Sequence, residues 1–386
     1  MVQYGIDQLL GAHHALIDRR RLGLISHYAM TDGSLRPVID RLRDNPASEL
    51  VRLFGPEHGV LNAAREGEPI EWGKDAHSGL EAVSLYGSLK APRPDMLTDL
   101  DVLVIDLADI GCRYYTNAST LYYAIESAAS VGIPVVVLDR PNPLGGIRRE
   151  GLVLDRAFQS FVGMLPVPIR HGLTFGEQAR LIQRQWFPKA AIAVVPVSGW
   201  TRHMLWPELA RPFVPPSPNT TSFEMALLYP GMCLFEGTNV SVGRGTTHPF
   251  EWVGAPWADG HAVAEAFNAA KLPGVYARPV YFTPWRSLYA SEMLSGVHIH
   301  VTDPPQVESL RTGMVLLHLF SQIYPNRFEW RIPGEHANPR FFDLLAGGTA
   351  LRQAIQSDRM SQYFAQEAEQ IRQFSQSIAP IILYQN

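Results

Sequence analysis

The stretch that decides the fold is VLVIDL at residues 102–107, a continuous apolar run with one acid near its end. Such a run is typical of a central strand that is buried on both faces of a parallel sheet. A second run of this kind, IPVVVL at residues 133–138, follows it. Between the two, residues 116–130 place Ala, Leu, Tyr and Ile at three- and four-residue steps, which predicts a helix capped by Thr116 or Asn117.

The same alternation of strands and helices extends on both sides of this pair. Short apolar runs predict further strands at residues 23–28, 50–54, 82–86 and 191–197. Helical spacing occurs at residues 37–43 and at 174–186, where Thr174 and Glu177 form a capping box. Strands that alternate with helices predict an α/β fold with a mostly parallel sheet covered on both faces. The site of such a sheet is expected at the carboxyl ends of its strands.

A Pro-rich segment at residues 211–221 (RPFVPPSPNTT) separates this half of the chain from a half with another pattern. Two stretches of the second half predict strands, at residues 275–281 and 296–302. Three stretches predict helices, at residues 307–323, 339–345 and 361–378. We therefore expect two domains, an α/β domain over residues 1–210 and a smaller α+β domain over residues 211–386.

The composition is that of a folded protein with a substantial core, since 46% of the 386 residues are hydrophobic and 18% are charged. The net charge of −4 and the lack of a long basic run argue against a nucleic-acid partner. No window approaches 18 uncharged apolar residues, so no membrane span is expected. The first residues lack the basic and apolar regions of a leader, so we expect a cytoplasmic protein; a chain whose leader had been removed would look the same.

Several familiar motifs are missing from the sequence. Cys112 and Cys233 form no CxxC pair, and we expect them to be buried thiols. There is no GxSxG elbow and no GxGxxG opening a helix, so a serine hydrolase and a dinucleotide site lack their signatures. His298 and His300 lie on one face of a predicted strand, but the sequence places no acidic third ligand beside them. Neither a metal nor an organic cofactor is predicted.

The first candidate for chemistry is FGPEHG at residues 54–59, which follows a predicted strand. Gly55 and Pro56 make a sharp turn, and Glu57 and His58 come directly after it. A rigid turn can hold a Glu partly away from water, which suits a general acid. The alternative is a Glu that caps the segment after the turn.

The loop DLADIGCRYYT at residues 106–116 is the second candidate. Asp106 stands at the end of the central strand, and Arg113 is the expected partner of this buried carboxylate. Asp109 is a further carboxylate of the loop. Tyr114 and Tyr115 suit a sugar site, because a tyrosine face stacks on pyranose C–H groups. The alternative is a structural Asp–Arg pair that holds the loop.

A third loop, DRPNPLGG at residues 139–146, follows the next predicted strand. Its two prolines fix the backbone and present Arg140 and Asn142. Glu150 comes soon after and is a second candidate acid. The alternative is a tight connection between a strand and a helix.

The most polar and Gly-rich stretch is FEGTNVSVGRGTTHPFE at residues 235–251. Arg244 stands between two glycines and is a planar donor that suits a carboxylate. Other side chains of the stretch suit hydroxyl or acetamido groups: Glu236, Asn239, Thr246, Thr247 and Glu251. The stretch lacks the Gly-Lys-Ser/Thr ending of a phosphate-binding loop.

Five further motifs occur along the chain together with these four: SLYG (84–87), PIRHGLTFGE (168–177), PPSPN (215–219), YFTP (281–284) and HIHVTD (298–303). In this combination the chain resembles the exo-β-N-acetylmuramidase family over residues 6–385. The resemblance implies a Rossmann-like N-terminal domain without a dinucleotide and a smaller C-terminal domain that closes a cleft. It implies the removal of non-reducing terminal N-acetylmuramic acid from peptidoglycan fragments, with Glu57 as the acid. His58 and Asn219 join the expected sugar-binding residues.

Glycoside hydrolysis normally requires a second group beside the proton donor. Asp106, Asp109, Glu150, Glu236 and the acetamido oxygen of the substrate are all candidates for that role. The guanidinium groups that suit the lactyl carboxylate of muramic acid are those of Arg113, Arg140 and Arg244.

The sequence departs from the family pattern over residues 60–67, at Val242 and at His248. These departures keep two other hypotheses open. One is a non-catalytic protein that binds muropeptides, and the other is an enzyme for a different amino sugar or an ester.

Overall fold

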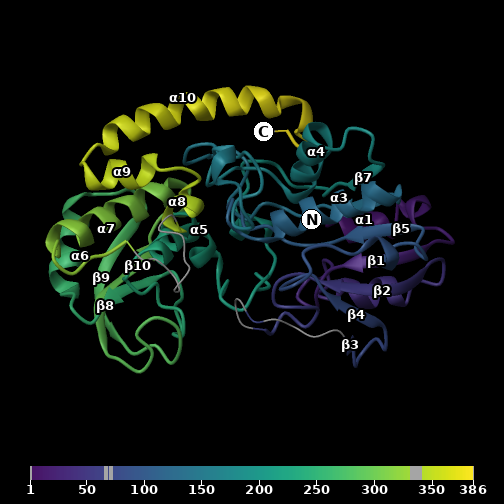
Figure 1. Cartoon of the computed structure of the whole chain (residues 1–386), viewed down its shortest axis with the longest axis horizontal. Coiled ribbons are helices and arrows are strands. Elements are labelled where there is room, and N and C mark those ends of the chain that lie inside the picture. Colours follow the sequence, from purple (N-terminus) through teal and green to yellow (C-terminus); the bar gives the residue numbers. More distant parts are fainter. Residues whose placement is uncertain (1, 65–67, 69–72, 331–340, 386) are drawn as a thin grey trace.

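The computed structural model describes residues 2–64, 68, 73–330 and 341–385, which form two sheets with helices around them (Figure 1). The first sheet has seven strands in the order β3-β4-β2-β1-β5-β6-β7. Its neighbouring strands run parallel, except for the antiparallel pair β3 and β4. The strands are β1 (Arg21–Ile25), β2 (Glu49–Gly55), β3 (Gly73–Lys74), β4 (Glu81–Ser84), β5 (Val102–Ile105), β6 (Val135–Leu138) and β7 (Ile192–Val195). The predicted α/β class with a mostly parallel sheet is confirmed.

Strand β5 is buried on both faces, as its apolar run predicts. Val102 and Val104 pack with helices α1 and α2 on one face, whereas Leu103 and Ile105 pack with α3 and α4 on the other. The helices of this part are α1 (Gly5–Leu9), α2 (Val38–Arg43), α3 (Asn117–Val131) and α4 (Phe175–Gln185). The predicted capping box at the start of α4 is present.

The second half of the chain forms a three-stranded antiparallel sheet in the order β8-β10-β9. Its strands are β8 (Trp252–Ala255), β9 (Val275–Phe282) and β10 (Leu294–Val301). Its helices are α5 (Phe223–Met232), α6 (Gly260–Ala269), α7 (Ser309–Ile323), α8 (Phe341–Ala346), α9 (Ala350–Gln356) and α10 (Met360–Ile378). The expected strands, and the expected helices at 307–323 and 361–378, are confirmed within a few residues. The expected helix at 339–345 matches α8, but residues 339 and 340 lie outside the described residues.

Four elements of this part were not predicted: β8, α5, α6 and α9. Helix α5 is apolar and buried at every position but Glu224 and contains Pro230, so its sequence carries no helical periodicity. It forms because it is buried against α7. A Cβ atom on Gly231 would lie 2.1 Å from the carbonyl oxygen of Ser309, so the two backbones approach as closely as glycine allows.

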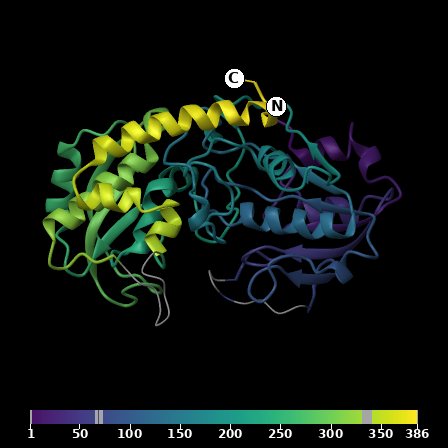
Figure 2. The ribbon, with the colours of Figure 1, turned by 45° about the horizontal axis from the view of Figure 1, so that its top comes forward.

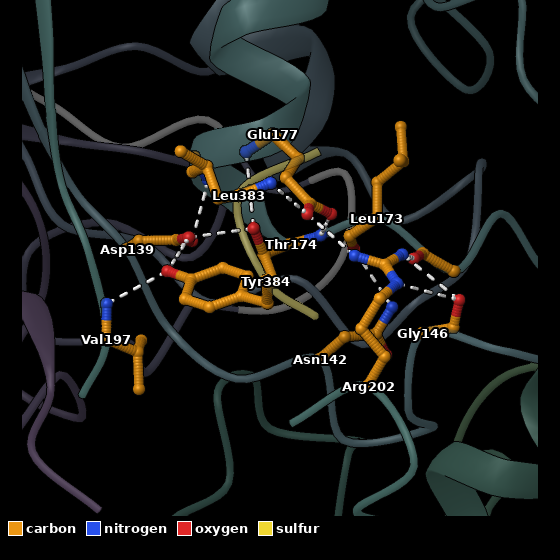
Figure 3. Close-up of polar contacts among 12 residues, drawn as sticks. Asp139, Asn142, Gly146, Leu173, Thr174, Glu177, Val197, Arg202, Leu383 and Tyr384 are labelled. Atoms are coloured by element: carbon orange, nitrogen blue, oxygen red, sulfur yellow. Dashed lines mark hydrogen bonds and ion pairs between the residues drawn. The ribbon is translucent and has the colours of Figure 1, made fainter. Parts of the chain in front are cut away.

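Helix α10 and the residues after it join the two halves. The helix begins beside α9 in the second half of the chain and crosses to the first half, where the C-terminus lies near α4 (Figures 1 and 2). The tail is pinned there by buried polar contacts (Figure 3). The Tyr384 hydroxyl donates to Asp139 at 2.5 Å and accepts from the Val197 amide at 2.9 Å, and the Leu383 amide donates to Glu177 at 3.0 Å. No helix in the described part of the chain is long and apolar enough to cross a membrane.

A Glu367→Gln substitution on α10 is expected to stabilise the protein at pH 8 by about 1–3 kcal/mol. Glu367 accepts a hydrogen bond from the Gly151 amide, and burial raises the pKa of its carboxyl from 4.5 to about 7. The folded state therefore holds a proton that the unfolded state releases, so this group's contribution to stability is lost as pH rises from about 4.5 to 7. Glutamine keeps the acceptor and removes the charge.

Thermal unfolding at pH 5 and pH 8 measures this difference. Glu369→Gln is the matched control, because Glu369 lies on the same helix in an exposed pair with Arg372. A Glu367→Gln variant that unfolds at a lower temperature than wild type at pH 8 would contradict the expected sign.

Candidate active site

A cavity of about 370 Å³ lies between the carboxyl edge of the first sheet and the second half of the chain. Residues that follow β2, β4 and β5 line it on one side: Glu57, His58, Tyr86, Tyr114, Tyr115, Thr116 and Asn117. Residues of the second half, with the segment before α5, line the other side, and they include Ser217, Asn219, Thr220, Tyr229, Cys233, Glu236, Arg244, Phe250, Phe341 and Leu345. The cavity thus lies at the edge of the sheet where a site was expected.

Glu57 enters the cavity from the sharp turn after β2. A Cβ atom on Gly55 would lie 2.5 Å from the Val60 amide nitrogen, so the turn closes this tightly only with glycine. Glu57 is partly exposed, and its Oε2 accepts a hydrogen bond of 2.6 Å from the Thr116 hydroxyl. Thr116 was expected to cap α3. It occupies the N-cap position, but its side chain makes no capping bond and instead orients the Glu57 carboxylate.

Glu236 and Arg244 form an ion pair on the opposite wall. Arg244 Nε lies 2.5 Å from Glu236 Oε1, and the guanidinium lies over the Phe250 ring at 4.8 Å from its centroid. The Cys233 thiol donates to the other Glu236 oxygen at 3.4 Å. The cavity therefore holds carboxylates from both halves of the molecule and a guanidinium beside one of them.

Aromatic rings cover much of the remaining wall. Tyr114 and Tyr229 pack against each other with centroids 5.6 Å apart, and Tyr229 packs edge-on against Phe250 at 4.7 Å. The buried Tyr114 hydroxyl donates to the Pro230 carbonyl oxygen, so it anchors α5. Burial raises the pKa of Tyr115, whose hydroxyl is hydrogen-bonded to Ser217 and Thr220. A cavity with tyrosine faces, carboxylates and hydroxyl groups has the chemistry of a sugar site.

Two family descriptions match the chain in succession. "Exo-beta-N-acetylmuramidase NamZ, N-terminal" matches residues 22–224, and the C-terminal counterpart matches residues 227–384. This chain belongs to the NamZ exo-β-N-acetylmuramidase family. The peptidoglycan β-N-acetylmuramidase NamZ of Bacillus subtilis (strain 168) is 39% identical over 384 residues, which cover 99% of this chain and 91% of that protein.

Two crystal structures of DUF1343-family proteins from Bacteroides fragilis NCTC 9343 share the fold of this NamZ-family chain. The first is 31% identical with a TM-score of 0.89, and the second is 27% identical with a TM-score of 0.75. Each alignment covers 100% of this chain and 99% of the other. The resemblance drawn from the motifs is therefore confirmed.

Seven of the residues expected at the site line the cavity: Glu57, His58, Tyr114, Tyr115, Asn219, Glu236 and Arg244. Sequence reasoning missed Thr116, although it directly follows the two tyrosines in the same loop. It also missed Ser217, which lies in the PPSPN motif that contributed only Asn219, and Thr220, which directly follows that motif.

Asp106 and Arg140 do not line the cavity. They form a bidentate pair with N···O distances of 2.5 and 2.9 Å, and Asp106 is fully buried. The expectation that Arg113 is the partner of Asp106 was therefore wrong, since Arg140 takes that place. Their pair lies directly after β5 and β6, near the point between β1 and β5 where doubly wound sheets bind dinucleotides. The pocket that Arg140 lines there has a volume of about 40 Å³.

Arg113 and Glu150 hold segments of the chain together, although Arg113 was expected to bind the sugar and Glu150 to act in catalysis. Arg113 donates to the carbonyl oxygens of Leu152, Val167 and Leu345 at 2.8–3.0 Å, and burial lowers the pKa of its guanidinium to about 10. Glu150 pairs with Arg170 at 2.9 Å. It also accepts from the Leu310 amide in the first turn of α7 at 2.7 Å, which ties the two halves together.

Asp109 and Asn142 also stabilise loops outside the cavity. Asp109 accepts from the Gly111 amide and, at 2.8 Å, from Gln178. Asn142 donates to the Leu173 carbonyl oxygen at 2.9 Å and accepts from the Leu144 amide at 2.9 Å. A tight structural connection, the alternative weighed for Asn142, describes this loop.

Four polar residues of the 235–251 stretch also lie away from the cavity wall. Asn239 bonds to the backbone of Arg327 and Glu329 at 2.7 and 2.9 Å. Thr246 donates to the Gly243 carbonyl oxygen at 2.6 Å, and Thr247 is exposed. Glu251 lies beside two histidines at the edge of the second sheet. Of the family departures, Val242 is buried in the core, and residues 65–67 lie outside the described residues.

A Thr116→Val substitution is expected to lower kcat about tenfold and leave KM nearly unchanged, because the Glu57 carboxylate loses the hydrogen bond that orients it. Initial rates on a soluble muramide substrate measure the effect. Ser119→Ala is the control, since Ser119 lies one turn along α3 and its hydroxyl donates to the Phe161 carbonyl oxygen. Equal rates for Thr116→Val and wild type would show that the bond has no catalytic role.

Proposed function

We propose that this chain hydrolyses the β-glycosidic bond of a non-reducing terminal N-acetylmuramic acid in peptidoglycan fragments, with Glu57 as the proton donor. The observation that carries the proposal is the oriented Glu57 carboxylate in a cavity that a second carboxylate, Glu236, also lines. Glycosidases of the common type use two groups on either side of the scissile bond. Family membership and the Bacillus subtilis relative support the same reaction.

Of the five candidates for the second catalytic group, two fit the cavity. Asp106, Asp109 and Glu150 are held in contacts elsewhere, which leaves Glu236 and the acetamido oxygen of the substrate. We propose Glu236 for this role. NMR identifies the anomer that is released first, and the activity of the Glu236→Gln variant then distinguishes the two candidates. Loss of turnover supports Glu236, whereas unchanged turnover supports the acetamido oxygen.

Arg244 is the arginine proposed to bind the lactyl carboxylate, because Arg113 and Arg140 lie outside the cavity. A charge-assisted hydrogen bond contributes about 1.5–3 kcal/mol, which corresponds to a preference for muramic acid over glucosamine of about tenfold to a hundredfold. The Arg244→Gln variant is therefore expected to lose selectivity rather than all turnover.

Release of p-nitrophenol from the β-N-acetylmuramide and from the β-N-acetylglucosaminide tests the proposal. Turnover of the muramide alone supports it. Equal turnover of both sugars favours an enzyme for another amino sugar. Binding of N-acetylmuramic acid by calorimetry without any turnover favours a muropeptide-binding protein. A cytoplasmic location, as for a recycling enzyme, stays a prediction that activity in cell fractions checks.

A further inference from the structure

Three side chains at the edge of the second sheet converge on one point. His248 and Glu251 belong to the loop that leads into β8, and His298 lies in the middle of β10. Glu251 Oε2 lies 3.6 Å from His248 Nδ1 and 3.5 Å from His298 Nε2. One ligand atom from each of the three residues lies within 4.8 Å of the other two.

The two distances from Glu251 Oε2 to the imidazole nitrogens fit the ligand set of a transition-metal ion. With Zn–N bonds of about 2.0–2.1 Å, two ligand atoms of a tetrahedral site lie about 3.4 Å apart. Two imidazoles and one carboxylate are the donors of many zinc sites in which a water fills the fourth position. The sequence had suggested His298 without an acidic ligand, and Glu251 supplies it from a distant part of the chain.

Burial of the cluster favours a built site over a chance surface contact. The side chains of His298 and Glu251 are only 10% and 12% exposed, whereas that of His248 is 40% exposed. Two ligands are thus held by the fold, and the third leaves a path from solvent.

The surroundings set limits on the affinity. The His300 ring packs against His298 with centroids 3.8 Å apart, and Trp252 packs against His248 at 4.8 Å. Arg278 lies opposite His298 in the register of β9 and β10, and its fixed positive charge opposes a cation. We therefore expect binding weaker than that of a closed structural zinc site.

We propose that His248, Glu251 and His298 bind one Zn²⁺ ion, which joins the loop before β8 to β10. The same loop carries Arg244 and Phe250 into the cavity. A bound ion would therefore also brace one wall of the cavity. The proposal does not depend on the reaction that the cavity supports, because its test measures binding and stability.

Isothermal titration of ZnCl₂ into the full chain, after treatment with EDTA and removal of the chelator, is the test. We expect one equivalent to bind to wild type and to raise its unfolding temperature. His248→Arg should weaken binding at least tenfold, because a guanidinium still pairs with Glu251 but does not ligate zinc. His298→Gln should do the same. His261→Gln, at an exposed histidine of α6, should bind as wild type does.

Absence of a one-equivalent site in wild type would overturn the proposal. So would a site that His248→Arg leaves unchanged, since the zinc would then be bound by other histidines. His298 is buried, and its variant risks misfolding. The result for His248→Arg therefore decides whether the proposal holds, because the His248 side chain is the most exposed of the three.

Discussion

The Glu57→Gln variant is expected to lose about a thousandfold in kcat on a β-N-acetylmuramide while it unfolds at the temperature of the wild-type protein. General acid catalysis contributes about 10²–10⁴-fold, and the upper part of that range applies to an alkoxide leaving group that must be protonated. Glutamine keeps the shape of the side chain and can still accept from the Thr116 hydroxyl. It has no acidic proton to transfer, so only the rate of the chemical step should fall.

Rates on the p-nitrophenyl substrate would understate this effect, because p-nitrophenolate leaves readily without a proton. A disaccharide substrate with a sugar leaving group gives the full effect. Glu49→Gln is the control, since Glu49 begins the same strand β2 and pairs with Arg21 at the surface. If Glu57→Gln keeps more than a tenth of wild-type kcat on the disaccharide, another group donates the proton, and Glu236 is the next candidate.

The Arg140→Met variant is expected to lose about 3–5 kcal/mol of folding free energy, which is the usual cost of removing one partner of a buried ion pair. Asp106 has no exposed surface, and Arg140 supplies both of its charge-assisted hydrogen bonds. Without the guanidinium, the carboxylate stays buried with neither counter-charge nor solvent. The loss should appear as a lower unfolding temperature, with normal activity per folded molecule.

The Asp106→Leu/Arg140→Met double variant should recover most of the lost stability, because both charges are then replaced by apolar groups. Arg43→Met is the surface control. Arg43 pairs with Asp40 at 3.1 Å with its side chain 29% exposed, and its loss should cost less than about 1 kcal/mol. An Arg140→Met variant as stable as this control would show that the pair has no structural role, and a catalytic role for Asp106 would need to be tested again.

Most strands of the fold could be predicted because their signal is local. The VLVI run of β5 is apolar at every position, since parallel strands between two helical layers are buried on both faces. Helix α5 escaped prediction for the opposite reason. It is buried at every position but Glu224 and contains Pro230, so neither its periodicity nor its composition distinguishes it from a loop or a strand.

The turn that carries Glu57 could also be predicted from the sequence, because Gly55 and Pro56 restrict the backbone by themselves. The hydrogen-bond partner of Glu57 could not be predicted. Thr116 stands at the start of a helix, where a threonine side chain normally caps the helix. Its hydroxyl donates to Glu57 instead, because the fold brings the turn after β2 next to the start of α3.

By itself, the sequence determined the α/β class, the family and the loops from which the site is built. Only the tertiary structure decided which charged residues of those loops face the cavity and which are paired in the interior. Asp106 and Glu57 look alike in the sequence, since each follows a buried strand with an arginine or a histidine nearby. Asp106 is neutralised by Arg140 from the neighbouring strand end, whereas Glu57 meets a hydroxyl at the cavity edge. The free energy of a buried charge depends on groups that are distant in sequence, so no local pattern encodes the difference.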